Sequence, residues 1–280
     1  MAEKKMTSLE WSLYVTVLSC SVVSMLGSGF ICYMFLKYER LQSFPYVLVF
    51  FLAASDLLNA IALALPGQVA AVPAICTLQA TLHGVSSLSS VLWTGAIPYA
   101  LWLIITKDVP GDSGWVKRAF AGFTCLALAA GLLPVVFDLY GPTGLWCWIR
   151  ETSLLGSIMV FATYYVFLVT VFVESIVFSC LSVTALRKQR LGSASRKYLF
   201  KKAILFPIVT AVAILPVFTL RVSYLLGWTQ SEPLFFIAAA FYSLWGAFNA
   251  IVYGLSHNVR QLLWGRRSVL IDETASALTN

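Results

Sequence analysis

Four ionisable side chains lie inside long apolar stretches of the sequence, and they are the residues best able to do chemistry. They are Asp56, His83, Glu174 and Arg221. A charged group in hydrocarbon costs about 3 kcal/mol or more, so such residues face a bundle interior, a partner or a water-filled cavity. Each of the four is therefore a candidate for ligand binding, ion binding or conformational switching.

Asp56 lies too far from either end of its apolar stretch for its carboxylate to reach water. Asn249 and Tyr253 are four residues apart in a later stretch, on one helical face, and provide polar partners for it. A buried carboxylate that binds a proton or a cation gives the bundle two electrostatic states. This pattern predicts a switch at Asp56, Asn249 and Tyr253, with Pro216 as a hinge. The alternatives are a static hydrogen-bonded cluster and a fixed kink at the proline.

Of the other three ionisable residues, Arg221 and His83 each allow two interpretations. Arg221 is either an anion-binding group of an outward-facing pocket or a side chain that extends to the nearby membrane surface. His83 either lines the same pocket or is a satisfied core histidine. Glu174 pairs with a polar group that the sequence does not identify.

The composition places these residues in a membrane protein. Hydrophobic residues make up 60% of the 280 residues and charged residues 11%, against about 45–50% and 25% in soluble domains. A helix needs roughly 20 apolar residues to cross a bilayer. Seven stretches meet this requirement, at residues 11–36, 46–70, 76–105, 116–140, 157–186, 203–228 and 234–256. The sequence predicts an all-α membrane protein, a seven-transmembrane helix bundle at 11–256.

The distribution of lysine and arginine predicts the orientation of this bundle. One side of the predicted membrane carries Lys37, Arg40, Lys107, Lys117, Arg118, Arg187, Lys188, Arg190, Arg196, Lys197, Lys201, Lys202, Arg260, Arg266 and Arg267. The other side carries only Lys4, Lys5 and Arg150. Residues 1–10 are therefore expected outside the cell, and residues 257–280 in the cytoplasm.

The segment after the seventh stretch has the pattern of a short amphipathic helix. Within 258–267, the apolar side chains of Val259, Leu262, Leu263 and Trp264 share one face, opposite the arginines. Such a helix lies in the lipid headgroup layer. The alternative is a frayed basic tail.

Two cysteines fall on the predicted outer side. Cys76 opens the third stretch, and Cys147 lies in the loop after the fourth, between Trp146 and Trp148. The outer side is oxidising, which favours a disulfide over two free thiols. The bridge would hold the loop over the mouth of the bundle, where the two tryptophans could close over a ligand.

Several functional classes are disfavoured. The net charge of +7 lies in short connectors, which suits lipid headgroups or a cytosolic partner and not nucleic acid. His83 and His257 are the only histidines and lie at opposite ends of the predicted bundle, so a zinc hydrolase is not expected. No lysine in 234–256 could carry a retinal Schiff base. We expect no enzyme, metal or cofactor.

Four segments together resemble a known family. They are Gly-Ser-Gly-Phe at 27–30, Leu-Ala-Ala-Ser-Asp at 52–56, Trp-Cys-Trp at 146–148 with Cys76, and Phe-Asn-Ala-Ile-Val-Tyr-Gly at 248–254. This combination resembles the cyclic-AMP-receptor-like class of G-protein-coupled receptors, which includes slime-mould receptors and plant receptor-like proteins. The rhodopsin-like class is less similar, because its inner motif is missing at 104–108 and Ala250 stands where that class has proline.

The resemblance implies a receptor that senses an extracellular small molecule and activates a heterotrimeric G protein by helix rearrangement. The expected ligand-binding residues are His83, Trp93, Trp146, Trp148 and Arg221. The expected G-protein contacts are Arg187, Lys188, Arg190, Lys201 and Lys202. The alternative function is a transporter or channel, whose path would use the intramembrane residues Asp56, Glu174 and Arg221.

Overall fold

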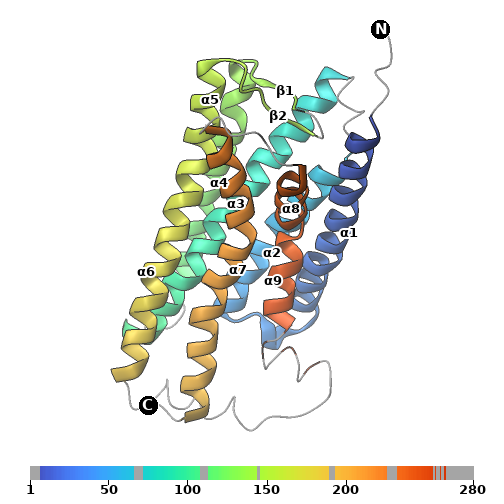
Figure 1. Ribbon diagram of the computed structural model, residues 1–280. Coiled ribbons are helices and arrows are strands. Elements are labelled where there is room, and N and C mark those ends of the chain that lie inside the picture. Colours follow the sequence, from blue (N-terminus) through green and yellow to red (C-terminus); the bar gives the residue numbers. More distant parts are fainter. Residues whose placement is uncertain are drawn as a thin grey trace.

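The computed structural model describes residues 7–65, 72–107, 113–143, 146–188, 193–225 and 232–254, together with Ser256, Val259 and Leu262. These residues form a bundle of long helices with one small hairpin at its end (Figure 1). The helices are α1 (Ser8–Lys37), α2 (Phe44–Ala64), α3 (Pro73–Lys107), α4 (Ser113–Val136), α5 (Leu154–Val160), α6 (Val166–Lys188), α7 (Ser193–Leu225), α8 (Glu232–Ser243) and α9 (Trp245–Gly254). Shorter elements are η1 (Glu39–Leu41), η3 (Phe161–Tyr165), β1 (Tyr140–Pro142) and β2 (Cys147–Ile149).

The predicted helical membrane protein is confirmed at the level of apolar spans. Among the described residues, five helical segments are long and apolar enough to cross a bilayer: α1, α2, α3, α4 and the run Leu154–Lys188. The pair α8 and α9 gives a sixth span if the two are counted together, and α7 holds a shorter apolar segment at Ile208–Ser223. A count of seven crossings therefore stays a prediction.

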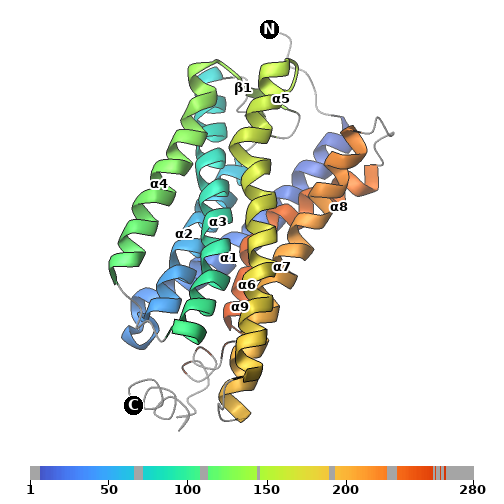
Figure 2. The same ribbon diagram turned by 90° about the vertical axis from the view of Figure 1, so that its left-hand side faces the viewer.

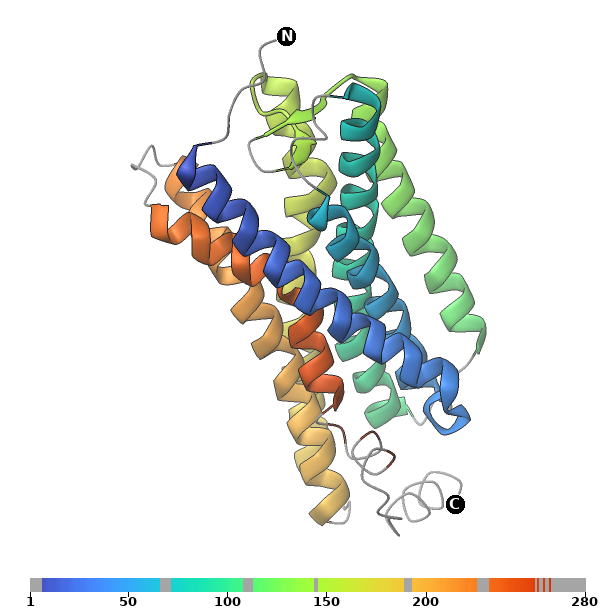
Figure 3. The ribbon, with the colours of Figure 1, turned by 90° about the vertical axis from the view of Figure 1, so that its right-hand side faces the viewer.

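Helix α3 is the central element of the bundle. It contacts α2, α4, α6 and α7 and both strands of the hairpin. Figure 2 shows α4 on one side of α3 and α6 on the other, with the hairpin above them. Figure 3 shows α1 crossing α8 and α9 on the opposite side, where it also packs along α2. Polar residues of α3 can therefore meet partners from several helices.

The outer faces of the helices are apolar, as expected for contact with lipid. Leu26 of α1 is 70% exposed and Val136 of α4 is 77% exposed. In a soluble protein such surfaces would form aggregation-prone patches. The interior is held by side chains such as Leu52 and Leu168, which are almost fully buried.

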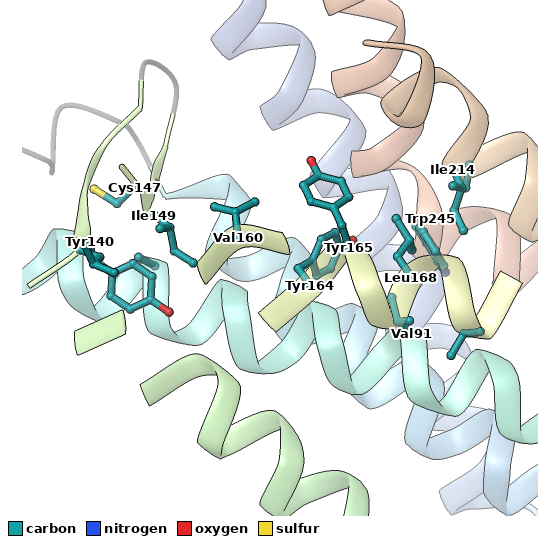
Figure 4. Close-up of a cluster of buried hydrophobic side chains, with 14 of the residues drawn as sticks. Val91, Tyr140, Cys147, Ile149, Val160, Tyr164, Tyr165, Leu168, Ile214 and Trp245 are labelled. Carbon is teal, nitrogen blue, oxygen red and sulfur yellow. The ribbon is translucent and has the colours of Figure 1, made fainter. Parts of the chain in front are cut away.

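A cluster of buried side chains connects the hairpin to the middle of the bundle (Figure 4). Tyr140, Cys147 and Ile149 form its hairpin end, and Leu168 and Trp245 lie at the other end. Between them, the π-helical turn η3 interrupts the span Leu154–Lys188. A π turn shifts the helical register by one residue, and here both Tyr164 and Tyr165 are buried within it. The hairpin is thus continuous with the packed core.

The only strands among the described residues form this hairpin, where the sequence predicted a loop. Strands β1 and β2 pair antiparallel, with Tyr140 opposite Ile149 and Pro142 opposite Cys147. The Tyr140 hydroxyl donates to the Gly131 carbonyl of α4 at 2.7 Å. Burial raises the pKa of this hydroxyl, so it keeps its proton and the bond. The hairpin is therefore tied to α4 as well as to α3.

The last two helices are separated at Leu244 and bend by 49°. Gly246, just after the break, lies so close to α1 that an added Cβ would be 2.3 Å from Ser28 Oγ and 2.6 Å from Ser24 Oγ. The same Cβ would lie 3.1 Å from the Cβ of Asp56. Only a glycine allows α9 to approach α1 and α2 this closely.

Gly246→Ala is expected to push α9 away from α1 and to lower the free energy of unfolding by about 2 kcal/mol, as overpacking does. Thermal unfolding of the detergent-solubilised protein measures the effect. Gly254→Ala is the matched control, because nothing lies within 4 Å of an added Cβ there. Equal melting temperatures for the two variants would contradict the close packing of α9.

Most of the predicted amphipathic helix at 258–267 lies outside the described residues. Val259 and Leu262 are helical, and they pack in a cluster with Ile31 and Met34 of α1 and with Tyr253. Two of the four apolar side chains that define the predicted face thus contact the bundle.

Candidate functional site

The Asp56 carboxylate is the centre of a buried polar network that joins three helices. Its Oδ1 accepts a short hydrogen bond from the Ser90 hydroxyl of α3. Its Oδ2 accepts a hydrogen bond of 2.8 Å from the Asn249 amide of α9. All three side chains are less than 9% exposed. Both carboxylate oxygens thus have a donor, which offsets the cost of burying the group in the membrane.

Asn249 lies where the sequence placed it, but the structure does not bring Tyr253 to Asp56. The Tyr253 ring instead contacts Tyr46 edge to face, with centroids 5.9 Å apart. Its hydroxyl is buried and has no hydrogen-bond partner among the described residues. One helical turn carries Tyr253 past the carboxylate, towards the first turn of α2 where Tyr46 lies. The prediction that Tyr253 is a polar partner of Asp56 is therefore wrong.

A second polar pair lies one turn nearer the hairpin. Asn59 Oδ1 is 2.7 Å from Nδ1 of His83, so α2 and α3 are joined at this level too. Asn59, Ser90 and Tyr242 line a small cavity of about 10 Å³ between the two levels. This space is at the lower limit of what a single water molecule needs, and polar walls suit a water. His83, Asn59, Ser90 and Asp56 thus follow one another between α2 and α3, and we call this series the polar line.

The hairpin tryptophans cover the His83 end of this line. Trp148 lies 4.7 Å from the His83 ring and Trp146 lies 6.3 Å from it, measured between ring centroids. Tyr242 of α8 contacts the same histidine at 5.8 Å. We call Trp146 and Trp148 the tryptophan roof. The structure thus brings together three of the five predicted ligand-binding residues.

The expected disulfide between Cys76 and Cys147 is present and anchors the tryptophan roof to the first turn of α3. The bridge joins two residues 71 positions apart in the sequence. Both cysteines are at most 4% exposed. The roof is thereby fixed over His83.

Gln79 is a second anchor, which the sequence analysis did not identify. Its Oε1 accepts a hydrogen bond of 3.1 Å from the Cys147 amide. Its Nε2 donates to the Ala62 and Leu65 carbonyls at the end of α2, at 2.9 and 3.1 Å. A sequence signal existed, because Gln79 is one turn from Cys76 and one turn from His83 on a helical face.

Gln79→Ala is expected to release the hairpin from α2, because it leaves the Cys147 amide and two carbonyls without this partner. Three lost bonds of about 0.6–1 kcal/mol each give a destabilisation of about 2 kcal/mol. Hydrogen exchange of the 140–149 amides should rise by at least about tenfold. Gln42→Ala is the control, since the exposed Gln42 makes one bond to the Phe35 carbonyl. Unchanged exchange in Gln79→Ala would contradict the anchor.

Arg221 is paired within the protein. Its guanidinium forms an ion pair of 2.7 Å with Glu151, which follows the hairpin, and a short hydrogen bond to the Tyr165 hydroxyl. Tyr165 contacts Tyr164, and Tyr164 contacts Trp148 of the roof, with centroids 5.5 and 6.1 Å apart. Arg221 is therefore connected to the roof through aromatic rings. Sequence spacing could not identify Glu151 as its partner, because 70 residues separate the two.

Trp93 is not brought near the roof, contrary to the prediction. It stacks on Phe51 of α2 at 4.9 Å and contacts Phe123 of α4 at 5.0 Å. Ten residues separate it from His83 on α3, which is roughly 15 Å along a helix. Trp93 is a core residue between α2, α3 and α4 in this structure.

The remaining predicted residues lie at the other end of the bundle or along α7. Arg187 and Lys188 occupy the last turn of α6, and Figure 1 shows that α6 and α7 extend beyond the other helices at the end opposite the hairpin. Arg190 lies outside the described residues, and the side chains of Lys201 and Lys202 are not described. Pro216 lies within α7, which is one helix from Ser193 to Leu225.

Comparisons with known proteins agree with this architecture. A family model described as slime mold cyclic AMP receptor matches residues 4–264. The "Cyclic AMP receptor-like protein A" of Dictyostelium discoideum is 27% identical over 178 residues, 63% of this chain and 45% of that protein. The "G-protein coupled receptor 157" of Mus musculus is 31% identical over 151 residues, 51% of this chain and 46% of that protein.

A plant protein shows a similar likeness. The "G-protein coupled receptor 1" of Arabidopsis thaliana is 29% identical over 149 residues, 52% of this chain and 44% of that protein. The matches thus span less than half the length of each of these relatives. The relatives carry receptor names, and the family match covers nearly the whole chain, as the resemblance at 27–30, 52–56, 146–148 and 248–254 predicted. The chain belongs to the slime mold cyclic AMP receptor family.

Proposed function

We propose that the chain is a seven-helix receptor that senses an extracellular small molecule and activates a heterotrimeric G protein. The seven crossings would be α1, α2, α3, α4, the run from α5 to α6, α7, and the bent pair α8 and α9. Residues 1–10 would lie outside the cell, 11–256 would form the bundle, and 257–280 would form the amphipathic helix and cytoplasmic tail. The family membership supports a receptor role for this bundle.

The proposed orientation puts the hairpin outside the cell. A disulfide needs an oxidising compartment, and Cys76–Cys147 lies at the hairpin end. The basic residues Arg187 and Lys188 lie at the opposite end, as the positive-inside rule requires of a cytoplasmic face. These two features support the proposed orientation.

The ligand would bind beneath the tryptophan roof, next to His83. This position is supported by the aromatic contacts around the imidazole and by the ion pair of Arg221 with Glu151 nearby. The cavity below His83 has only about 10 Å³ of space. Ligand entry would therefore require the hairpin to move, and an acidic ligand group could compete with Glu151 for the guanidinium.

The polar line between the roof and Asp56 is the observation that carries the proposal. His83 with Asn59, the small cavity, and Asp56 with Ser90 and Asn249 connect α2, α3 and α9 at successive levels. Ligand binding at one end would favour a different arrangement of these bonds if the ligand binds that state more tightly. Movement of α7 and α9 would then open the inner end of the bundle, with Pro216 as the hinge of α7.

The G protein would bind at the inner ends of α6 and α7. These helices extend past their neighbours, and Arg187 and Lys188 give the end of α6 a positive charge (Figure 1). Arg190, Lys201 and Lys202 would extend this basic surface in the connector and the start of α7. Charges of this kind increase the rate of partner association more than the final affinity.

The test is nucleotide exchange on purified heterotrimers by receptor reconstituted in nanodiscs, with nucleotide ligands including cyclic AMP as first probes. Receptor-dependent exchange is the expected result, and charge reversal by R187E and K188E should reduce it. Solute flux through proteoliposomes without any exchange would support the transporter interpretation instead.

A further inference from the structure

A cleft of about 370 Å³ lies between α3, α4 and α6, away from the polar line and the roof. Ligand sites in proteins typically measure about 300–1,000 Å³. Aromatic rings form part of its walls: Tyr99 contacts Phe178 at 5.0 Å and Trp115 at 6.0 Å, and Phe123 lines the same space. The cleft is therefore large enough for part of a lipid and offers flat apolar surfaces.

The Glu174 carboxylate faces this cleft without a partner among the described residues. The side chain is only partly buried, and its Oε2 lies against α3 where Gly95 leaves room, 3.3 Å from the position of a Cβ. An intramembrane carboxylate is costly unless a donor or a cation pairs with it. Since no described side chain of the walls pairs with it, a molecule bound in the cleft would supply the partner.

Arg118 lines the same cleft and has no ion pair among the described residues. It is exposed and lies in the second turn of α4, at the end of the bundle opposite the hairpin. A basic residue at a helix end lies at the level of the lipid headgroups. The cleft thus offers one positive and one negative group that do not neutralise each other.

The route into the cleft leads from the bilayer. Val173 and Val177, beside Glu174 on α6, are 53% and 46% exposed, and Phe120 of α4 is 44% exposed. The two valines are part of the lipid-facing surface next to Glu174. The occupant should therefore be a membrane component with a zwitterionic head.

We infer that this cleft is a binding site for an aminophospholipid such as phosphatidylethanolamine. The primary ammonium would donate to Glu174, the phosphate would pair with Arg118, and chain atoms would lie against the aromatic walls. The free acceptor oxygens of Glu174 select a primary ammonium over a quaternary one, which has no N–H to donate. The inference goes beyond the receptor proposal and requires only that the protein lies in a membrane.

The test compares lipids bound to delipidated full-length protein in detergent, by native mass spectrometry. Three dioleoyl lipids are used: phosphatidylethanolamine, phosphatidylcholine and phosphatidylglycerol, which lacks an amine. We expect phosphatidylethanolamine to bind about tenfold more tightly than the other two, the order of one charge-assisted hydrogen bond. Glu174→Gln should remove this preference and leave phosphatidylcholine binding unchanged.

Matched variants distinguish lipid binding in the cleft from lipid binding elsewhere on the surface. Arg118→Gln should weaken all three lipids, whereas Lys117→Gln, at an exposed neighbour that does not line the cleft, should not. Ala119→Trp should fill the cleft and abolish the preference, whereas Ala121→Trp on the exposed face of α4 should preserve it. Equal binding of the three lipids by the wild type would overturn the inference. So would an intact preference in Ala119→Trp, even if Glu174→Gln failed to fold.

Discussion

Asp56→Asn is expected to lose receptor-stimulated nucleotide exchange by about tenfold or more while the protein remains folded. The substitution keeps the shape of the side chain and an acceptor for the Ser90 hydroxyl. Asn249 can then turn its amide so that its oxygen meets the new NH₂ group. The substitution removes the negative charge. The side chain can then no longer alternate between a charged state and one neutralised by a proton or a cation. A coupling free energy of about 1–3 kcal/mol corresponds to a change of roughly 5–150-fold.

Asp56→Ala separates this switching role from a purely structural one. It leaves the Ser90 hydroxyl and the Asn249 amide without their acceptor and should lower the free energy of unfolding by about 1–2 kcal/mol. Asp56→Asn should lower it by less than about 1 kcal/mol. The measurements are surface expression, thermal unfolding and nucleotide exchange on the same preparations. Parallel loss of folding and exchange in Asp56→Asn would mean that the cluster only holds the helices together.

Removing the disulfide should have the second largest effect. Cys76→Ser with Cys147→Ser frees the hairpin, so the tryptophan roof is no longer fixed over His83. From chain entropy alone, a disulfide that closes a loop of this length should raise the free energy of unfolding by about 4 kcal/mol. In a bilayer the unfolded state keeps its inserted helices and is already restricted. The double variant should therefore lose only about 2 kcal/mol of its free energy of unfolding. We also expect ligand-stimulated exchange to disappear, since the roof forms one wall of the proposed site.

Cys125→Ser is the matched control for this pair, because Cys125 is a free, exposed cysteine of α4. It should unfold at the wild-type temperature and keep full exchange. Thermal unfolding with and without reducing agent gives the same comparison on one preparation. A double variant that retains the wild-type melting temperature and exchange would show that the disulfide is not needed to anchor the hairpin.

The features that the sequence predicted well are those for which the membrane leaves few energetically acceptable alternatives. Apolar length predicted the spans, because backbone groups in lipid leave few alternatives to a helix. The buried position of Asp56 and its pairing with Asn249 followed from the cost of an unpaired carboxylate. The disulfide followed from the expected side of Cys76 and Cys147.

A polar stripe on α3 could have been recognised and was not. Buried polar residues recur there at steps of three or four positions, which is the spacing of one helical face. They are Gln79, His83, Ser86, Ser87, Ser90 and Thr94. The stripe identifies the face of α3 that meets α2 and the hairpin, and it includes both the roof anchor and the Asp56 partner.

The details that sequence could not supply depend on contacts between distant segments. Trp93 lies on a different face of α3 from His83, so its neighbours were determined by how α2 and α4 pack. The pairing of Arg221 with Glu151 depends on the path of the chain after the hairpin. The close approach of Gly246 to α1, just after the break at Leu244, depends on how the last two helices pack. None of these has a local spacing that would reveal it.

The distance between the inner ends of α3 and α6 tests the receptor account most directly. Spin labels at Thr106→Cys and Thr184→Cys, with the four free cysteines replaced by serine, report this distance in nanodiscs and leave the proposed contact residue Arg187 in place. With nucleotide-free heterotrimer bound, we predict a population with a longer distance, and its loss in Asp56→Asn. Identical distance distributions with and without the heterotrimer, in every G protein tried, would contradict the account.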